Sequence, residues 1–415
     1  MSKARYYLEQ TVPELEDLQK KGLFEKQEIT QIMRRRTDFE HRLNSRGSKT
    51  RDYLKYVEFE ENLEKLRKKR YARLSKAGLV NTKPSISDWA SERRILFIFD
   101  RSIQKFPNDF LLWENYLNFA KQRKIFKKIY TIYNQLLQLH PTHVQSWLNA
   151  ANFEYEVVGS AKNARTLFQK GLRFNKDSSK LWIEYALFEL SYITKLLNRR
   201  KILGLVTEKQ QLEHESSEQK GGDFGTDDMI KVPSFTRDEA RDQLNQLPDA
   251  DLNMLGNPET NPALRGDVAL TIFDIGMDTL WGFKKANQMA NEFDFKYDLA
   301  LKFIDVFNKF TDLDRDYLNS HVVQYLTRSF SNEIKCVYLD ITIPLINCSI
   351  KDGKFIESLQ FATKKYLIFK KKLGNEADQL ELKNLFTQFI IERFLQDEET
   401  DDKTKALLNT ILKKL

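Results

Sequence analysis

The chain has 415 residues, of which 41% are hydrophobic and 30% are charged, a composition that excludes both a membrane-embedded and a wholly disordered protein. No apolar run approaches the roughly 18 to 20 residues that cross a bilayer, and the first residues, MSKARYYLEQ, contain no hydrophobic signal segment. We therefore expect a soluble intracellular protein. Glycine and proline are sparse and no Val/Ile/Thr-rich alternating segments recur, so we expect an all-α fold.

Positive charge is concentrated in the first half of the sequence. Residues 1–210 contain 41 Lys and Arg against 24 Asp and Glu, whereas residues 211–415 contain 26 against 35. A positive potential draws polyanions, so the first half contains the candidate contacts for RNA or for an acidic partner. A solvated helical face is the commoner origin of such clusters, and both interpretations stay open. The candidates are Arg34, Arg35, Arg36, Arg67, Lys68, Lys69, Arg70, Lys124, Lys127, Lys128, Arg199, Arg200 and Lys201.

Residues 1–80 are predicted to form short helices that cap a helical array and to include its first half-repeat. Leu15 and Leu18 precede a turn at Gly22, and Ile32 follows that turn within a second run of helical spacing. A terminal repeat needs a partner on one side and water on the other, and we predict that this region has that role.

Three tryptophans, Trp113, Trp147 and Trp182, recur at intervals of 34 and 35 residues within a block predicted at 81–206. Such a period is typical of stacked helix pairs. Because one pair cannot cover its own apolar face, we predict that each indole packs against the neighbouring pair and that the stack forms an α–α superhelix. The residues predicted to pack the repeats are Tyr53, Tyr56, Phe99, Trp113, Tyr116, Tyr133, Trp147, Phe168, Trp182, Tyr185 and Phe273.

Small residues at Ser102, Gly171 and Gly276 are predicted to allow close helix approach at the same register. The segment ALTIFDIGM, residues 269–277, repeats the pattern of ARTLFQKGL, residues 164–172. We therefore predict that it supplies the displaced partner of the helix that Trp182 opens.

An insertion separates that partner from its repeat. Residues 207–262 contain Gly-Gly, acidic runs and four prolines, and they have too few apolar side chains to offset the entropy of ordering, so we expect them to be disordered. Residues 263–415 return to apolar spacings of three and four and are predicted to form a carboxy-terminal HAT-like helical domain.

Nothing in the sequence predicts catalysis. Cys336 and Cys348 lack metal-ligand spacing and are interpreted as core thiols, while Glu154 and Glu189 are interpreted as structural acids on the inner stripe of a repeat. DLDRD lacks the glycine and closing glutamate of a calcium loop, and GGDFG lacks the lysine of a phosphate loop. We expect no enzyme, no cofactor, no metal and no small-molecule substrate. The scattered histidines are His41, His140, His143, His214 and His321.

The repeat pattern, W-x2-Y-x3-E in the first helix and A-R-x2-F in the second, resembles HAT (half-a-TPR) repeats. Trp147, Glu154, Arg165 and Phe168 match it, whereas the unit at Trp113 departs from it. The succession PELEDL, KGLF, DFEHRL and DYLKYVEFE, with NPALRGDVALTIFD further on, resembles the U3-snoRNA-associated HAT-repeat family of the small-subunit processome.

That resemblance implies a nucleolar, and so nuclear, structural protein of the UtpB subcomplex, which acts in pre-rRNA processing toward the small ribosomal subunit. It also implies β-propeller subunits, U3 snoRNA and pre-rRNA as partners, with RNA contacted directly or indirectly. Two other hypotheses stay open. One is a HAT-repeat scaffold in pre-mRNA splicing or polyadenylation, and the other is a protein whose main activity is direct RNA binding.

Overall fold

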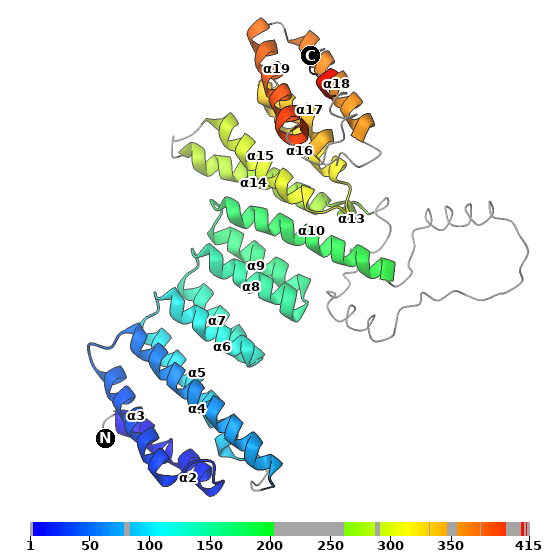
Figure 1. The fold of residues 1–415 in the computed structure, drawn as a ribbon. Helices are drawn as coiled ribbons and strands as arrows, with labels where there is room; N and C mark the ends of the chain where they lie inside the picture. The colour runs from blue at the N-terminus through cyan, green and yellow to red at the C-terminus, as the bar shows by residue number, and fades with distance from the viewer. Residues whose placement is uncertain are drawn as a thin grey trace, which may run out of the picture. The chain divides into compact units, whose positions relative to one another are not determined.

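The computed structural model of the chain describes residues 3–78, 84–202, 261–286, 291–331, 333–346, 355–373, 375–395, 408–410 and 412. Every regular element within these ranges is a helix, which confirms the all-helical prediction (Figure 1). The insertion predicted over 207–262 lies outside the described residues up to residue 260. None of the described helices combines the length and the apolar character that a membrane span requires.

The chain divides into two compact units, Met1–His140 and Pro141–Leu415, and this division falls inside the block that we predicted at 81–206. The first unit consists of α1 (Lys3–Glu9), α2 (Val12–Lys20), α3 (Lys26–Asn44), α4 (Thr50–Lys76), η1 (Ile86–Asp88), α5 (Ala90–Lys105), α6 (Phe110–Gln122) and α7 (Phe126–Leu139). The described part of the second unit begins with α8 (Val144–Phe153), η2 (Glu154–Val158), α9 (Ala161–Phe174) and α10 (Ser179–Ile202). It continues with α13 (Pro262–Arg265), α14 (Asp267–Ala286), α15 (Glu292–Asn308), α16 (Arg315–Ser329), α17 (Ile334–Ile346), α18 (Phe355–Lys372), α19 (Glu376–Ile390) and η4 (Ile391–Leu395).

The three periodic tryptophans share one hydrogen bond. Nε1 of Trp113, Trp147 and Trp182 donates to the main-chain carbonyl six residues earlier, over 2.8, 2.8 and 3.2 Å. Helical side chains lean toward the amino-terminal end of their helix, so an indole in the first turn reaches the loop before it. Each tryptophan therefore fastens the turn that precedes its own repeat.

The two helical glycines of the repeats lie directly against these indoles. A Cβ atom on Gly171 would lie 3.2 Å from Cγ of Trp147, and one on Gly276 would lie 3.2 Å from Cε3 of Trp182. These contacts confirm that the glycines permit close approach and that α14 supplies the displaced partner of α10. They also correct one prediction: Trp147 and Trp182 pack against the second helix of their own repeat, because the crossing of the two helices is where a large flat ring meets a residue without a side chain.

Stacked ring pairs, each 17 residues apart in sequence, connect one repeat to the next. Their ring centroids lie 4.9, 4.9 and 5.2 Å apart, with interplanar angles of 10°, 11° and 18°. The pairs are Phe39 with Tyr56, Phe99 with Tyr116, and Phe168 with Tyr185. All the residues predicted to pack the repeats are buried, none more than 8% exposed. Aromatic stacking between repeats thus performs the role that we had assigned to the tryptophans.

Candidate binding surfaces

Helix α3 contains a half-repeat that the sequence analysis missed. Arg36 donates from Nε and Nη2 to both carboxylate oxygens of Glu60, over 2.8 and 3.0 Å. Arg165 makes the same bidentate contact with Glu189, over 2.8 and 2.9 Å, and 24 residues separate the partners in each pair. Arg36 is therefore the repeat arginine of α3.

The position of Arg36 overturns its assignment to a surface cluster. Its side chain is fully buried and also lies 3.5 Å from Glu14, so it cannot reach an external phosphate. Arg94 contacts both Glu14 and Glu60. Burial works to raise the pKa of Glu60, but Arg36 and Arg94 outweigh it and hold that pKa below its usual value. Two arginines and two carboxylates thus form a charge-balanced core of the first unit.

Arg67 is the second basic residue that the structure places differently from our prediction. It donates to both oxygens of Glu64 over 2.8 Å and to Asp88 over 2.9 Å, and it is only 6% exposed. Lys21 also contacts Asp88, at 3.3 Å. Arg67 neutralises carboxylates and anchors η1 to α4, so its role is structural.

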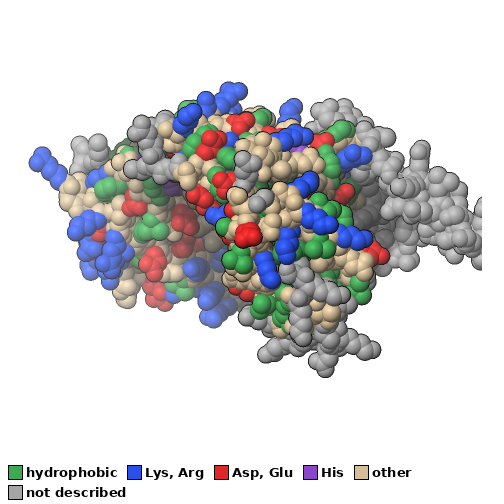
Figure 2. Space-filling view, turned by 90° about the horizontal axis from the view of Figure 1, so that it is seen from above, with side chains coloured by type: hydrophobic (Ala, Val, Ile, Leu, Met, Phe, Trp, Pro, Cys, Tyr) green, Lys and Arg blue, Asp and Glu red, His purple; other side chains and the backbone are tan. Residues whose placement is uncertain are grey.

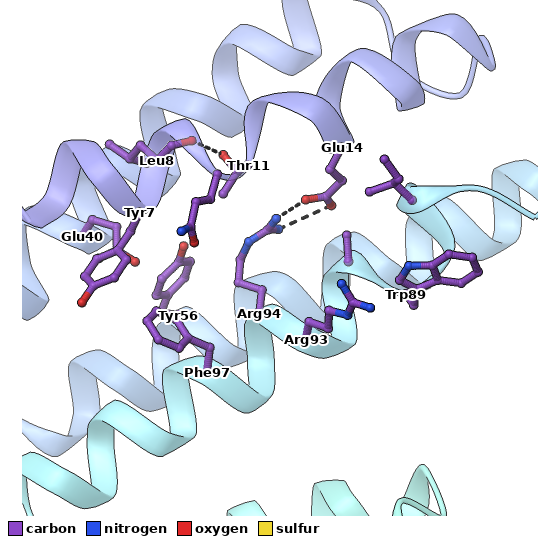
Figure 3. Close-up of a pocket in the computed structure, with 13 residues that line it drawn as sticks. Tyr7, Leu8, Thr11, Glu14, Glu40, Tyr56, Trp89, Arg93, Arg94 and Phe97 are labelled. Atoms are coloured by element: carbon purple, nitrogen blue, oxygen red, sulfur yellow. Dashed lines mark hydrogen bonds and ion pairs between the residues drawn. The ribbon is translucent and has the colours of Figure 1, made fainter.

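A groove lies among α1, α2, η1 and α5 of the first unit, and we call it the N-terminal groove. It has a volume of about 280 Å³. Arg94 reaches across from α5 to Glu14 on α2, with Tyr7 and Phe97 on one side of this pair and Trp89 and Arg93 on the other (Figure 3). Its lining residues are Tyr7, Leu8, Gln10, Thr11, Glu14, Glu40, Tyr56, Ile86, Trp89, Ala90, Arg93, Arg94 and Phe97.

One end of the N-terminal groove is built around Arg101. The guanidinium carbon of Arg101 lies 4.7 Å from the ring centroids of both Tyr7 and Phe97, and its Nη1 and Nη2 atoms donate to Glu40 over 2.9 and 2.8 Å. Burial opposes the charge of Arg101, but Glu40 more than offsets this and raises the pKa of the guanidinium. This ordered stack fixes the shape of the groove wall.

Six of the predicted basic contacts are exposed on the described surface: Arg34, Arg35, Lys68, Lys69, Lys124 and Lys127. Figure 2 shows Lys and Arg side chains in several groups with Asp and Glu among them on the face in view. The six exposed candidates themselves lie in three places along the first unit, namely α3, α4 and the segment from the α6–α7 turn into α7.

The other basic candidates are paired, partly buried or not described. Arg70 donates to Glu28 over 2.7 and 2.8 Å, and Lys128 donates to Asp100 over 2.9 Å. Arg199 is half-buried, and the side chains at positions 200 and 201, an arginine and a lysine in the sequence, lie outside the described residues.

Lys124 has an unusual backbone conformation for a residue with a side chain. Its φ is +55°, and hydrogen bonds from Ile125 to the Ala120 carbonyl and from Lys124 to Lys121 make a helix-ending motif that glycine favours. Gly22 has φ of +65° in the same motif after α2. A lysine therefore occupies a position where glycine would relieve backbone strain, and we interpret the exposed α6–α7 turn as a candidate contact.

Residues that we interpreted as structural have structural partners. Glu189 is fully buried beneath Arg165, and His140 places Nε2 2.8 Å from the Pro107 carbonyl, which also accepts the Trp113 indole hydrogen. Burial raises the pKa of the Cys336 thiol to about 11, while Cys348 lies outside the described residues.

Two known protein families match parts of the chain. The family described as U3 small nucleolar RNA-associated protein 6 matches residues 8–94, and the family described as PRP39 N-terminal HAT repeat matches residues 98–224. The first match extends from α1 into α5 and includes most of the N-terminal groove. The second confirms the HAT-repeat prediction for the helices from α6 to α10, which lie within the match.

Curated relatives have the same description as the first family. The chain is 37% identical over 239 residues to U3 small nucleolar RNA-associated protein 6 of Schizosaccharomyces pombe, covering 57% of this chain and 48% of the relative. The homologs of Mus musculus and Homo sapiens are 28% and 30% identical, covering 60% and 54% of this chain and 39% and 35% of their own lengths. The chain thus spans between about a third and a half of these relatives.

Proposed function

Since the chain belongs to the family of U3 small nucleolar RNA-associated protein 6, with HAT repeats, we propose that it is a non-catalytic scaffold subunit of the small-subunit processome. In this role it holds partner proteins and the U3 particle in fixed positions during nucleolar pre-rRNA processing. The observation that carries the proposal is the match over residues 8–94, since that match is specific to this family and HAT repeats alone are not.

Charge supports a position next to RNA. The first unit, Met1–His140, contains 30 Lys and Arg against 18 Asp and Glu, a net charge of +12. The second unit contains 37 against 41, a net charge of −4. We propose that the exposed residues Arg34, Arg35, Lys124 and Lys127 contact phosphates of U3 snoRNA or pre-rRNA.

Rigidity supports a scaffold. Bidentate ion pairs such as Arg36 with Glu60, ring stacks such as Phe168 with Tyr185, and indole hydrogen bonds to each preceding turn fix the position of each helix pair relative to the next within a unit. A surface of this kind can position β-propeller subunits of the UtpB subcomplex. The second family match, to a PRP39 HAT repeat, keeps a splicing or polyadenylation scaffold as the alternative.

The test is purification of the tagged full chain from nuclear extract, with proteins and RNAs identified together. We expect enrichment of U3 snoRNA and of processome subunits. Recovery of spliceosomal RNAs and splicing factors in their place would contradict the proposal and favour the alternative.

A double variant tests direct RNA contact. Exchanging Arg34 and Arg35 for Glu reverses two exposed charges and leaves the buried Arg36 in place. We expect weaker retention of U3 snoRNA with a smaller dependence on salt concentration, because fewer phosphates are neutralised, while the protein partners stay bound. Unchanged RNA retention would assign these residues to a solvated face.

A further inference from the structure

Some of the exposed apolar side chains of the first unit lie in or beside the N-terminal groove, while others, such as Leu139 on α7, lie elsewhere. Ile86, Trp89 and Phe97 line it and are 54%, 43% and 39% exposed. Tyr6 and Val12, at 54% and 40%, adjoin the lining residues Tyr7 and Thr11. Aromatic side chains left open to water beside a concave surface mark contact sites for other molecules.

The floor of the N-terminal groove already has its charges neutralised. Glu14 contacts Arg94 and Arg36, and Glu40 is held by Arg101. These carboxylates are therefore already neutralised and do not need a cation from a ligand. Because the pairs also fix the side chains in place, a ligand would meet a preorganised wall and lose little free energy in ordering it.

The backbone of Trp89 is anchored by the contacts of the neighbouring η1 segment. It caps the amino-terminal end of α5 directly after η1, and η1 is fastened by Asp88, whose carboxylate contacts Arg67 at 2.9 Å and Lys21 at 3.3 Å. An exposed indole on an anchored segment offers contact area without the entropic cost of ordering a loop.

Arg93 supplies a cation at the same end of the groove. It is exposed, and within the described part of the chain it has neither an ion pair nor a hydrogen bond from its side chain. A guanidinium beside an indole suits a ligand that places a carboxylate next to an apolar or aromatic group.

We propose that the N-terminal groove binds an extended acidic segment of a partner protein, with an aromatic or aliphatic side chain of that segment inserted between Trp89 and Phe97 and a carboxylate on Arg93. The volume of about 280 Å³ is below the roughly 300 to 1,000 Å³ of small-molecule sites and holds one or two side chains. The net charge of +12 on this unit favours an acidic partner.

RNA fits this groove less well than a peptide does. A single free arginine serves one carboxylate, whereas successive phosphates need several cations, and the other arginine in the lining, Arg94, is already paired with Glu14. The exposed basic residues Arg34, Arg35 and Lys124 are not among the residues that line the groove.

The test is selection of random twelve-residue peptides, displayed on phage, against the full chain and its variants. We expect enriched peptides to combine Asp or Glu with an aromatic or aliphatic residue. Selection on Arg93→Glu or Trp89→Ala should lose these peptides. The control variants are Arg35→Glu, which reverses an exposed charge outside the groove, and Leu139→Ala, which removes a side chain that is 55% exposed on α7.

The enriched peptide, labelled and measured by fluorescence anisotropy, gives the magnitude. We expect about tenfold weaker binding to Arg93→Glu and to Trp89→Ala, and a change within about twofold for both controls. Circular dichroism confirms that the variants are folded. Equal binding to all variants, enrichment of peptides without acidic residues, or displacement of the peptide by a twelve-residue oligouridine would overturn the proposal. Because the assay uses purified protein and peptides, its result is independent of the processome assignment.

Discussion

The adjacent arginines Arg35 and Arg36 allow a sharp test of how the first unit is stabilised. Arg36 is fully buried against Glu60, whereas Arg35 is exposed on the same helix. Removing one partner of a buried ion pair costs about 3 to 5 kcal/mol, because the other charge is left in a poorly solvated site. Arg94 still faces Glu60 at 3.0 Å, so we expect Arg36→Met to lower the free energy of unfolding by about 3 kcal/mol.

The matched variant Arg35→Met should change the free energy of unfolding by less than about 0.5 kcal/mol, as is usual for an exposed side chain. Urea unfolding followed by circular dichroism measures both. With a denaturant dependence of about 2 kcal/mol per molar, the midpoint of the transition that involves the first unit should fall by about 1.5 M for Arg36→Met only. Similar midpoints for the two variants would refute the buried network.

Three other predictions follow from the fold. Arg70→Gln should weaken the loss of stability at acid pH, because Arg70 lowers the pKa of Glu28 to about 2. The stabilisation from this pair is complete above pH 4.5 and is lost as the pH falls toward 2. Identical plots of unfolding free energy against pH for the wild type and the variant would contradict this prediction. Trp147→Ala should lower the free energy of unfolding, measured by thermal denaturation, by about 3 to 5 kcal/mol, because the indole is buried against Gly171. A decrease below about 1 kcal/mol would exclude this packing role. Lys124→Gly should raise stability by up to about 1 kcal/mol and weaken RNA retention in a filter-binding assay, whereas lower stability would show that the turn is unstrained.

Periodicity predicted the parts of the fold that repeat. The spacing of Trp113, Trp147 and Trp182 predicted helix pairs, and the likeness of two short segments predicted that the helix containing Gly276 pairs with the helix that Trp182 opens across a long insertion. These predictions succeed because a helix pair places each side chain at a fixed offset from its partner. The indole's own contact was mispredicted, since a period does not say which neighbour a side chain faces.

Charge composition could not separate buried from exposed arginines. Arg34, Arg35 and Arg36 form a run in which no arginine stands out by composition. Arg36 alone is followed by a phenylalanine after three residues and by its glutamate partner after 24 residues, as Arg165 is. That spacing was in the sequence and could have identified the half-repeat in α3.

The N-terminal groove had no such signal. Trp89 stands 24 residues before Trp113, off the repeat period, and the groove joins Tyr7 to Phe97 across some 90 residues of chain. Contacts between segments so far apart follow from tertiary packing, which local spacing does not encode.

The most direct test of the central claim is a pre-rRNA blot after depletion of the protein, with the intact chain restored as a control. We predict that early cleavages toward the small-subunit rRNA fail while large-subunit rRNA matures normally, and that the restored chain rescues the defect. Normal small-subunit maturation in depleted cells would contradict the account.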